Sequence, residues 1–173
     1  MSLSMYEASI PVFVRGLDNL AAILAKAAAH AEAKKFDGSV LVTSRLFPDM
    51  FPLARQVQIA CDTAKGCAAR LAGVEPPKHE DTESTFAELA ARIHKAREFV
   101  SSITAAQVDQ SRDKTITLPT PPPYPPMVFT GINYLTYFVL PNFYFHITTA
   151  YNILRHNGVE IGKFEYLGKP PTA

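Results

Sequence analysis

His146 is the side chain best suited to acid–base or metal chemistry, because an imidazole exchanges a proton near neutral pH and binds divalent cations. Asn142 lies four residues earlier, so the two side chains fall on one face of a helix. Gln56 lies beside the apolar residues of a second predicted helix, and its side chain is expected to point towards Asn142 and His146. A metal centre needs three or four good ligands, and amides bind transition metals weakly. We therefore expect no bound metal; if one is held, its ligands are His146, Gln56 and Asn142.

The residues around His146 form a stretch that permits more than one interpretation. Residues 137–156 read YFVLPNFYFHITTAYNILRH, and the nearly uncharged run that contains them is long enough to cross a membrane. Its asparagines, threonines and histidine are too many polar groups for a lone span, so we predict no membrane partner. Pro141 predicts a kink just before Asn142, and kinks often accompany sites. Alternatively, His146 only forms a hydrogen bond within the core.

Four amphipathic patterns predict the elements that position these residues. Apolar side chains recur every three or four positions over residues 6–31, 53–71, 86–103 and 131–156. Asp49 is expected to cap the second helix, with Pro52 in its first turn and Gly73 after its end. Thr85 and Glu88 predict a capping box for the third. Since no comparable set of strand patterns occurs, we predict an all-α four-helix bundle forming a single domain over residues 1–173.

A long proline-rich crossover, KTITLPTPPPYPPMVFTG, joins the third and fourth helices. Two short β-favouring runs, residues 115–118 and 127–130, flank its prolines. They predict a short β-hairpin or an extended cover over one end of the bundle. A linker stiffened by polyproline II is the other interpretation. A short apolar run at residues 40–42 predicts one further helical turn.

Composition and charge restrict the class of partner. Seventeen basic and sixteen acidic side chains leave a formal net charge of +1, which predicts no nucleic-acid partner and no binding to an anionic membrane surface. The N-terminal residues show no pattern of a secretory signal, so we expect a cytoplasmic protein. Cys61 and Cys67 lie six positions apart on one predicted helix, about 240° around its axis, and we expect two buried, reduced thiols.

Three segments resemble a known family. They read MYEASIPVFVRGLDNL, RLFPDMFPLARQVQIACDTAKGCAARLAG and VLPNFYFHITTAYNILRHNGVEIGKFEYLG, and they are similar to a bacterial family of unknown function within the DinB/YfiT-like superfamily of four-helix bundles. The resemblance implies homodimers. It also implies a place for a divalent metal, zinc or nickel, which superfamily members hold with one histidine of the second helix and an H-x-x-x-H pair of the fourth. Matching the motifs puts Asn142 and His146 at the pair and Gln56 at the third position.

Two classes of function follow from these observations. The first is a small-molecule-binding or dimeric structural protein that has lost the three-histidine metal site. Its ligand pocket would be formed by Gln56, Asn142 and His146 and closed by Tyr134, Tyr137 and the crossover, and its outward-facing aromatic side chains would form a homodimer interface. The alternative is a metal-dependent enzyme of the thiol-transferase type, in which His146 acts as a ligand or a general base. The sequence leaves open whether any reaction is catalysed.

Overall fold

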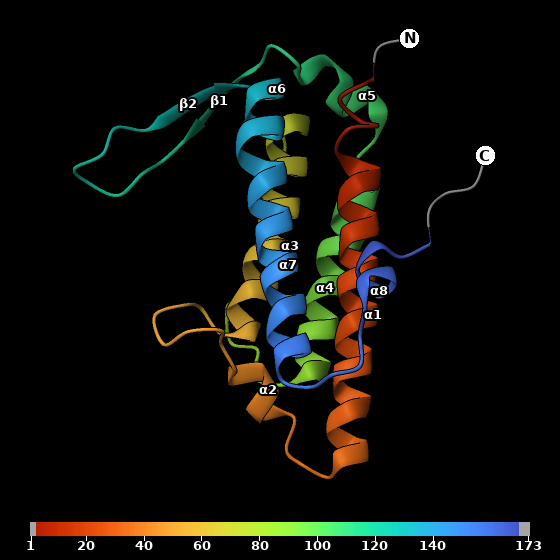
Figure 1. Ribbon diagram of the computed structural model, residues 1–173. Coiled ribbons are helices and arrows are strands. Elements are labelled where there is room, and N and C mark those ends of the chain that lie inside the picture. The colour runs from red at the N-terminus through yellow and green to blue at the C-terminus, as the bar shows by residue number, and fades with distance from the viewer. Residues whose placement is uncertain (1–2, 170–173) are drawn as a thin grey trace.

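The computed structural model describes residues 3–169, which form four long helices and several short elements (Figure 1). The long helices are α1 (Ile10–Lys34), α3 (Leu53–Ala72), α4 (Phe86–Ser102) and a composite fourth helix, which consists of α6 (Gly131–Asn133), the π-helical segment η2 (Tyr134–Val139) and α7 (Leu140–His156). Helices α1 and α3 each pack against both α4 and α7. The prediction of a four-helix bundle is confirmed.

Helices α3 and α4 run in the same direction, so the chain between them must travel back along the bundle (Figure 1). Residues 73–85 make this connection, and we call them the return segment. The capping box of Thr85 and Glu88 starts α4 as predicted. Gly73 ends α3 with a φ of 73°, a left-handed conformation that glycine adopts without a steric penalty. Pro52, and not Asp49, holds the N-cap position of α3, so that detail of the prediction was wrong.

The fourth helix departs from α geometry directly before its proline. Pro141 has no backbone N–H and its ring crowds the preceding turn, so a regular α-helix cannot pass through it undisturbed. The structure accommodates Pro141 by giving the preceding residues the π-helical conformation of η2. The irregularity therefore falls where the sequence predicted a kink, just before Asn142, and single π-helical turns of this kind are frequent at functional sites.

The proline-rich crossover forms a hairpin, the first of the two predicted arrangements. After α5 (Ala105–Val108) and the 3-10 turn η1 (Asp109–Ser111), strands β1 (Thr115–Leu118) and β2 (Met127–Thr130) pair in antiparallel register, and the hairpin extends sideways from one end of the bundle (Figure 1). Ile116 and Leu118 are buried. The base of the hairpin therefore packs on the helices. The predicted extra turn is α2 (Ser39–Thr43).

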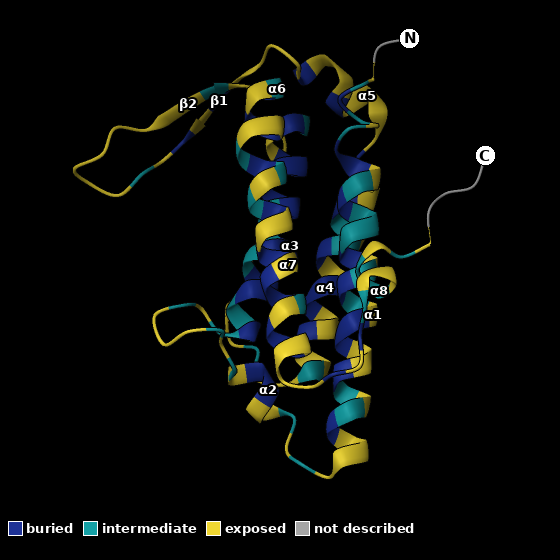
Figure 2. Cartoon of the chain, in the orientation of Figure 1, coloured by how far each residue is buried: buried dark blue, intermediate teal, exposed yellow. Residues whose placement is uncertain are grey.

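Buried side chains line the facing sides of the four helices (Figure 2). At the centre, Phe13 of α1 and Phe143 of α7 are fully buried and pack edge to face, with ring centroids 5.1 Å apart. Cys61 and Cys67 are free and buried, as predicted. The short helix α8 (Lys163–Leu167) lies against α1. Between residues 3 and 169, no helix is both long and apolar enough to cross a membrane.

Candidate functional site

His146 and Gln56 contact each other inside the bundle. The Nδ1 atom of His146 lies 2.7 Å from Oε1 of Gln56, and Nε2 of Gln56 donates to the carbonyl oxygen of Phe51 at 3.0 Å. Because Gln56 presents an acceptor, the imidazole proton belongs on Nδ1. Burial lowers the pKa of His146 below its usual value, and the positive charge of Arg55 adds to this effect. The pair is therefore a neutral, cross-helix hydrogen bond between α3 and α7.

Asn142 points to a different partner. Its Nδ2 atom donates to Oγ1 of Thr63 on α3 at 3.1 Å. The oxygen of Gln56 is already bonded to His146, so the three side chains that the resemblance matched to metal ligands do not converge on one point. Within residues 3–169, no group of three His, Cys, Asp or Glu side chains is arranged to hold a metal ion. The side chains at these positions do not fit a three-ligand metal centre.

A cavity of about 310 Å³ lies between α3, the fourth helix and the base of the hairpin, and its lining includes Asn142, one helical turn before His146. We call it the hairpin cavity. Helix α3 contributes three polar side chains, the hairpin contributes apolar ones, and the fourth helix contributes aromatic, aliphatic and amide groups. The lining residues are Asp62, Thr63, Arg70, Leu118, Pro119, Met127, Tyr134, Phe138, Val139 and Asn142.

The five predicted pocket residues are thus divided between three places. Tyr134 and Asn142 line the hairpin cavity together with the crossover. His146 and Gln56 are buried beside it and are not among its lining residues. Tyr137 is 79% exposed and also does not line the cavity. Thr63 and Arg70 were not predicted from the sequence, although they supply most of the free polar groups of the cavity.

The free polar groups of the hairpin cavity are hydrogen-bond donors. Arg70 donates to the hydroxyl of Tyr134 at 3.2 Å and makes no ion pair within the described residues. Burial raises the pKa of Tyr134 to about 12, so its hydroxyl keeps its proton and can donate. The hydroxyl of Thr63 accepts from Asn142 and can likewise donate. The carboxylate of Asp62 already contacts Lys65 at 3.0 Å, on the same helix.

Gly66 is the sequence feature that could have indicated the position of the Arg70 side chain. It is buried in α3, one turn before Arg70, and a Cβ there would lie 2.6 Å from the arginine Nη1 atom. The absence of a side chain at Gly66 therefore makes room for the guanidinium group to fold back along the helix.

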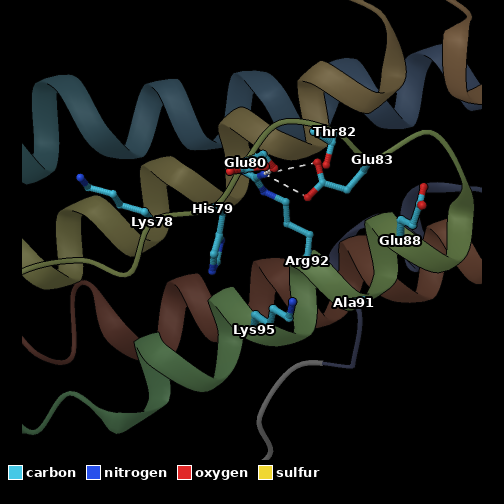
Figure 3. Close-up of a pocket in the computed structure, with 9 residues that line it drawn as sticks. All are labelled: Lys78, His79, Glu80, Thr82, Glu83, Glu88, Ala91, Arg92 and Lys95. Atoms are coloured by element: carbon cyan, nitrogen blue, oxygen red, sulfur yellow. Dashed lines mark hydrogen bonds and ion pairs between the residues drawn. The ribbon is translucent and has the colours of Figure 1, made fainter.

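An ionic network that the sequence analysis did not find holds the return segment on the bundle. Arg92 of α4 has a fully buried side chain. Its guanidinium group contacts the carboxylate of Asp62 on α3 at 2.9 Å, and those of Asp81 and Glu83 in the return segment at 2.9 and 3.0 Å. Figure 3 shows Arg92 reaching from α4 to Glu83 in the return segment. The sequence feature that could have indicated this network is a set of polar residues at helical spacing along one side of α3, namely Gln58, Asp62 and Lys65.

The fold and the cavity define a helical bundle of the DinB class with a polar recess between two of its helices and a crossover hairpin. The chain belongs to the family described as "Domain of unknown function (DUF1993)", which residues 5–167 match. A crystal structure of a DinB family member protein from Shewanella denitrificans shares 46% sequence identity, with 97% of this chain and 94% of that one covered and a TM-score of 0.88. No curated protein matches. These comparisons confirm the resemblance seen in the sequence.

Proposed function

We propose that this chain binds a small molecule that carries a carboxylate on an apolar body, and that the hairpin cavity is its site. The observation that carries the proposal is that three groups able to donate, on Arg70, Tyr134 and Thr63, line one cavity. A guanidinium and two hydroxyl groups suit a carboxylate, since charge-assisted hydrogen bonds are the strong ones. The volume of about 310 Å³ falls at the lower end of the usual range for ligand sites.

The other lining residues suit the apolar part of such a molecule. Phe138 and Val139 of the fourth helix lie opposite Leu118, Pro119 and Met127 of the hairpin, and all five contribute to the cavity wall. An aromatic or branched aliphatic group between them would lose contact with water while its carboxylate reaches the donors of α3. The crossover hairpin would then serve as one wall of the site.

The geometry supports binding over metal-dependent thiol transfer. The transferase alternative needs a metal ligand set, and Gln56 and His146 instead bond to each other while Asn142 bonds to Thr63. His146 is also only 7% exposed, which restricts the approach of a substrate to its ring. We propose that these residues fix the bundle beside the site and hold no metal. Elemental analysis of protein purified without chelator tests this, and one tightly bound zinc or nickel per chain would contradict it.

The binding proposal is tested with three probes that share one ring and differ in charge: benzoate, benzamide and benzylamine. Chemical shifts of backbone amides should identify the hairpin cavity, with benzoate binding most tightly. Arg70→Met should weaken benzoate at least tenfold, since a hydrogen bond to a charged group is worth about 1.5–3 kcal/mol, and should leave benzamide nearly unchanged. Asn142→Leu should abolish binding, whereas Asn152→Leu, on an exposed part of the same helix, should not. Equal binding of the three probes would refute the proposed ligand class.

We also propose that the exposed face of the fourth helix binds a second copy of the chain. Tyr137, Tyr144 and Phe145 are 79%, 43% and 55% exposed, and exposed residues run along the outer side of α7 (Figure 2). Residues 131–154 contain no charged side chain, so a two-fold axis would bring no like charges together. Phe145→Glu should convert a dimer to a monomer in light scattering, while Phe164→Glu, 86% exposed on α8, should not. A monomeric wild-type chain would refute this interface.

A further inference from the structure

The lining of the hairpin cavity carries one basic and one acidic side chain, Arg70 and Asp62. A simple carboxylate bound at Arg70 brings a second negative charge close to Asp62, whereas a molecule that also carries a positive charge offsets that repulsion. We propose that the ligand of this cavity is an apolar α-amino acid whose ammonium group binds at Asp62. This inference rests on the carboxylate site proposed above and adds to it the class of molecule that matches both charges.

Asp62 can accept an ammonium group in addition to its present contacts. One of its carboxylate oxygens contacts Lys65 at 3.0 Å, and the other contacts Arg92 at 2.9 Å. Arg92 shares its single positive charge with two further carboxylates, those of Asp81 and Glu83. A carboxylate offers about four acceptor positions, and the side chain of Asp62 is 41% exposed. Acceptor positions on Asp62 therefore remain open to a ligand.

The side-chain oxygen of Asn142 is a second acceptor for the ammonium group. The amide nitrogen of Asn142 donates to Thr63, the residue that follows Asp62 on α3, and its oxygen makes no hydrogen bond within residues 3–169. Because Asn142 contacts the neighbour of Asp62, the two acceptors belong to the same part of the lining. An ammonium group has three N–H donors, which is enough for both of them.

The spacing of the two charged groups suits an α-amino acid. The Nη1 atom of Arg70 lies 2.6 Å from where a Cβ of Gly66 would be, so the guanidinium group lies at the level of Gly66. Gly66 follows Asp62 by four residues, which advance a helix by about 6 Å. A carboxylate and an ammonium on one carbon atom, each with a hydrogen bond of about 2.7–3.2 Å to its partner, bridge a gap of this size. The amino-acid side chain would then lie against the apolar wall of the hairpin.

The test compares three molecules that share a phenylethyl group. Phenylalanine carries both charges, hydrocinnamate lacks the amino group, and phenethylamine lacks the carboxyl group. In calorimetric titrations of the full chain at neutral pH, phenylalanine should bind about tenfold more tightly than hydrocinnamate, and phenethylamine should bind most weakly. Asp62→Asn should remove the advantage of phenylalanine without weakening hydrocinnamate. Asp81→Asn is the matched control, since Asp81 pairs with the same arginine at a similar exposure of 38% but does not line the cavity; this variant should keep the advantage.

The wild-type chain alone separates this inference from the proposed function. If neither hydrocinnamate nor phenylalanine binds, the carboxylate site itself is refuted. If hydrocinnamate binds and phenylalanine binds no more tightly, the carboxylate site stands and the amino-acid class is refuted. Loss of the advantage in Asp81→Asn as well as in Asp62→Asn would also overturn the inference, because the effect would then come from the ionic network and not from a contact with the ammonium group.

Discussion

Replacing Arg92 with alanine should loosen the return segment and destabilise the whole bundle. The side chain of Arg92 is fully buried, and its guanidinium group contacts two acidic residues of the return segment, Asp81 at 2.9 Å and Glu83 at 3.0 Å. It also donates to the carbonyl oxygen of Glu80 at 2.9 Å. Three attachments of the segment, at residues 80, 81 and 83, therefore depend on one side chain, and the alanine variant removes all three. Asp81 keeps its contact with Arg55, and Glu83 keeps its hydrogen bond from Gln58.

The size of the effect follows from the exposure of the partners. Removing one member of a buried ion pair costs about 3–5 kcal/mol, chiefly because the remaining charge is left buried without a partner. Here the side chains of Asp62 and Asp81 are 41% and 38% exposed, so water can solvate them after the substitution. We therefore expect the low end, a loss of about 3 kcal/mol in the free energy of unfolding. For a chain of this size, that loss lowers Tm by about 6–12 °C.

Thermal and denaturant unfolding measure the global loss, and limited trypsin digestion measures the local one. Cleavage after Lys78, within the return segment, should become fast in Arg92→Ala while the helices remain protected. Arg97→Ala is the matched control, because Arg97 lies on the same helix and pairs with Asp18 at 3.0 Å, but both side chains are largely exposed. Exposed pairs contribute about 0–1 kcal/mol, so this variant should differ little from wild type.

The pH dependence of stability gives an independent check on the network. Burial alone would raise the pKa values of Asp81 and Glu83, but hydrogen bonds and the charge of Arg92 outweigh it and lower both, and Arg55 adds to the effect on Asp81. A carboxyl group with a lower pKa in the folded state stabilises the fold above the pKa of the unfolded chain. That stability disappears as the pH falls through the folded value. Arg92→Ala should therefore make the stability depend less on pH in this acidic range.

Two results together would refute this prediction. They are a loss of less than about 1 kcal/mol in the free energy of unfolding of Arg92→Ala and cleavage after Lys78 at the wild-type rate.

Three further predictions follow from the buried interior. Cys61 and Cys67 should not react with Ellman's reagent at pH 8 until the chain unfolds, because burial raises both thiol pKa values, that of Cys61 to about 12; rapid reaction of the native protein would contradict this. Gly131→Ala should lower the free energy of unfolding by about 2–3 kcal/mol, measured in urea, since a Cβ would overlap the carbonyl oxygen of Ser111. NMR titration of the His146 ring should give a pKa below the usual value for histidine. Its contribution to stability is then complete above about pH 6.5 and is lost as the pH falls towards the pKa of His146 in the folded state. A pKa at the usual value would argue against its burial.

The fold could be predicted from the sequence because its signals are local. The capping box of Thr85 and Glu88, the glycine that ends α3 and the periodic apolar residues each act over a few positions, and each was found in the structure. Even the hairpin was indicated by two short runs on either side of the prolines. Asp49 failed as a cap because Pro52 follows so closely, and its fixed φ places it at the N-cap position.

The candidate site was harder to predict because its geometry depends on contacts between distant residues. Periodicity placed Asn142 and His146 on one stripe, yet Asn142 faces Thr63 and a cavity while His146 faces Gln56 and the core. The π-helical turn before Pro141 changes the rotation of the residues ahead of it, and no pattern at 100° per residue describes that change. The charges of the return segment carry no periodicity at all, so the sequence could not assign them to Arg92.

Gln56, Asn142 and His146 have a physical role of their own, which is to fix how α3 and α7 fit together. Both helices present mainly small or apolar residues to each other, and such surfaces tolerate sliding. The hydrogen bonds Gln56–His146 and Thr63–Asn142 prevent such sliding, because a shift of one helix by a single residue turns its side chains by about 100° and breaks both bonds. The register that they set brings the fourth helix, with Tyr134, opposite Arg70. The residues of these two bonds therefore also fix where Arg70 and Tyr134 meet in the lining of the hairpin cavity.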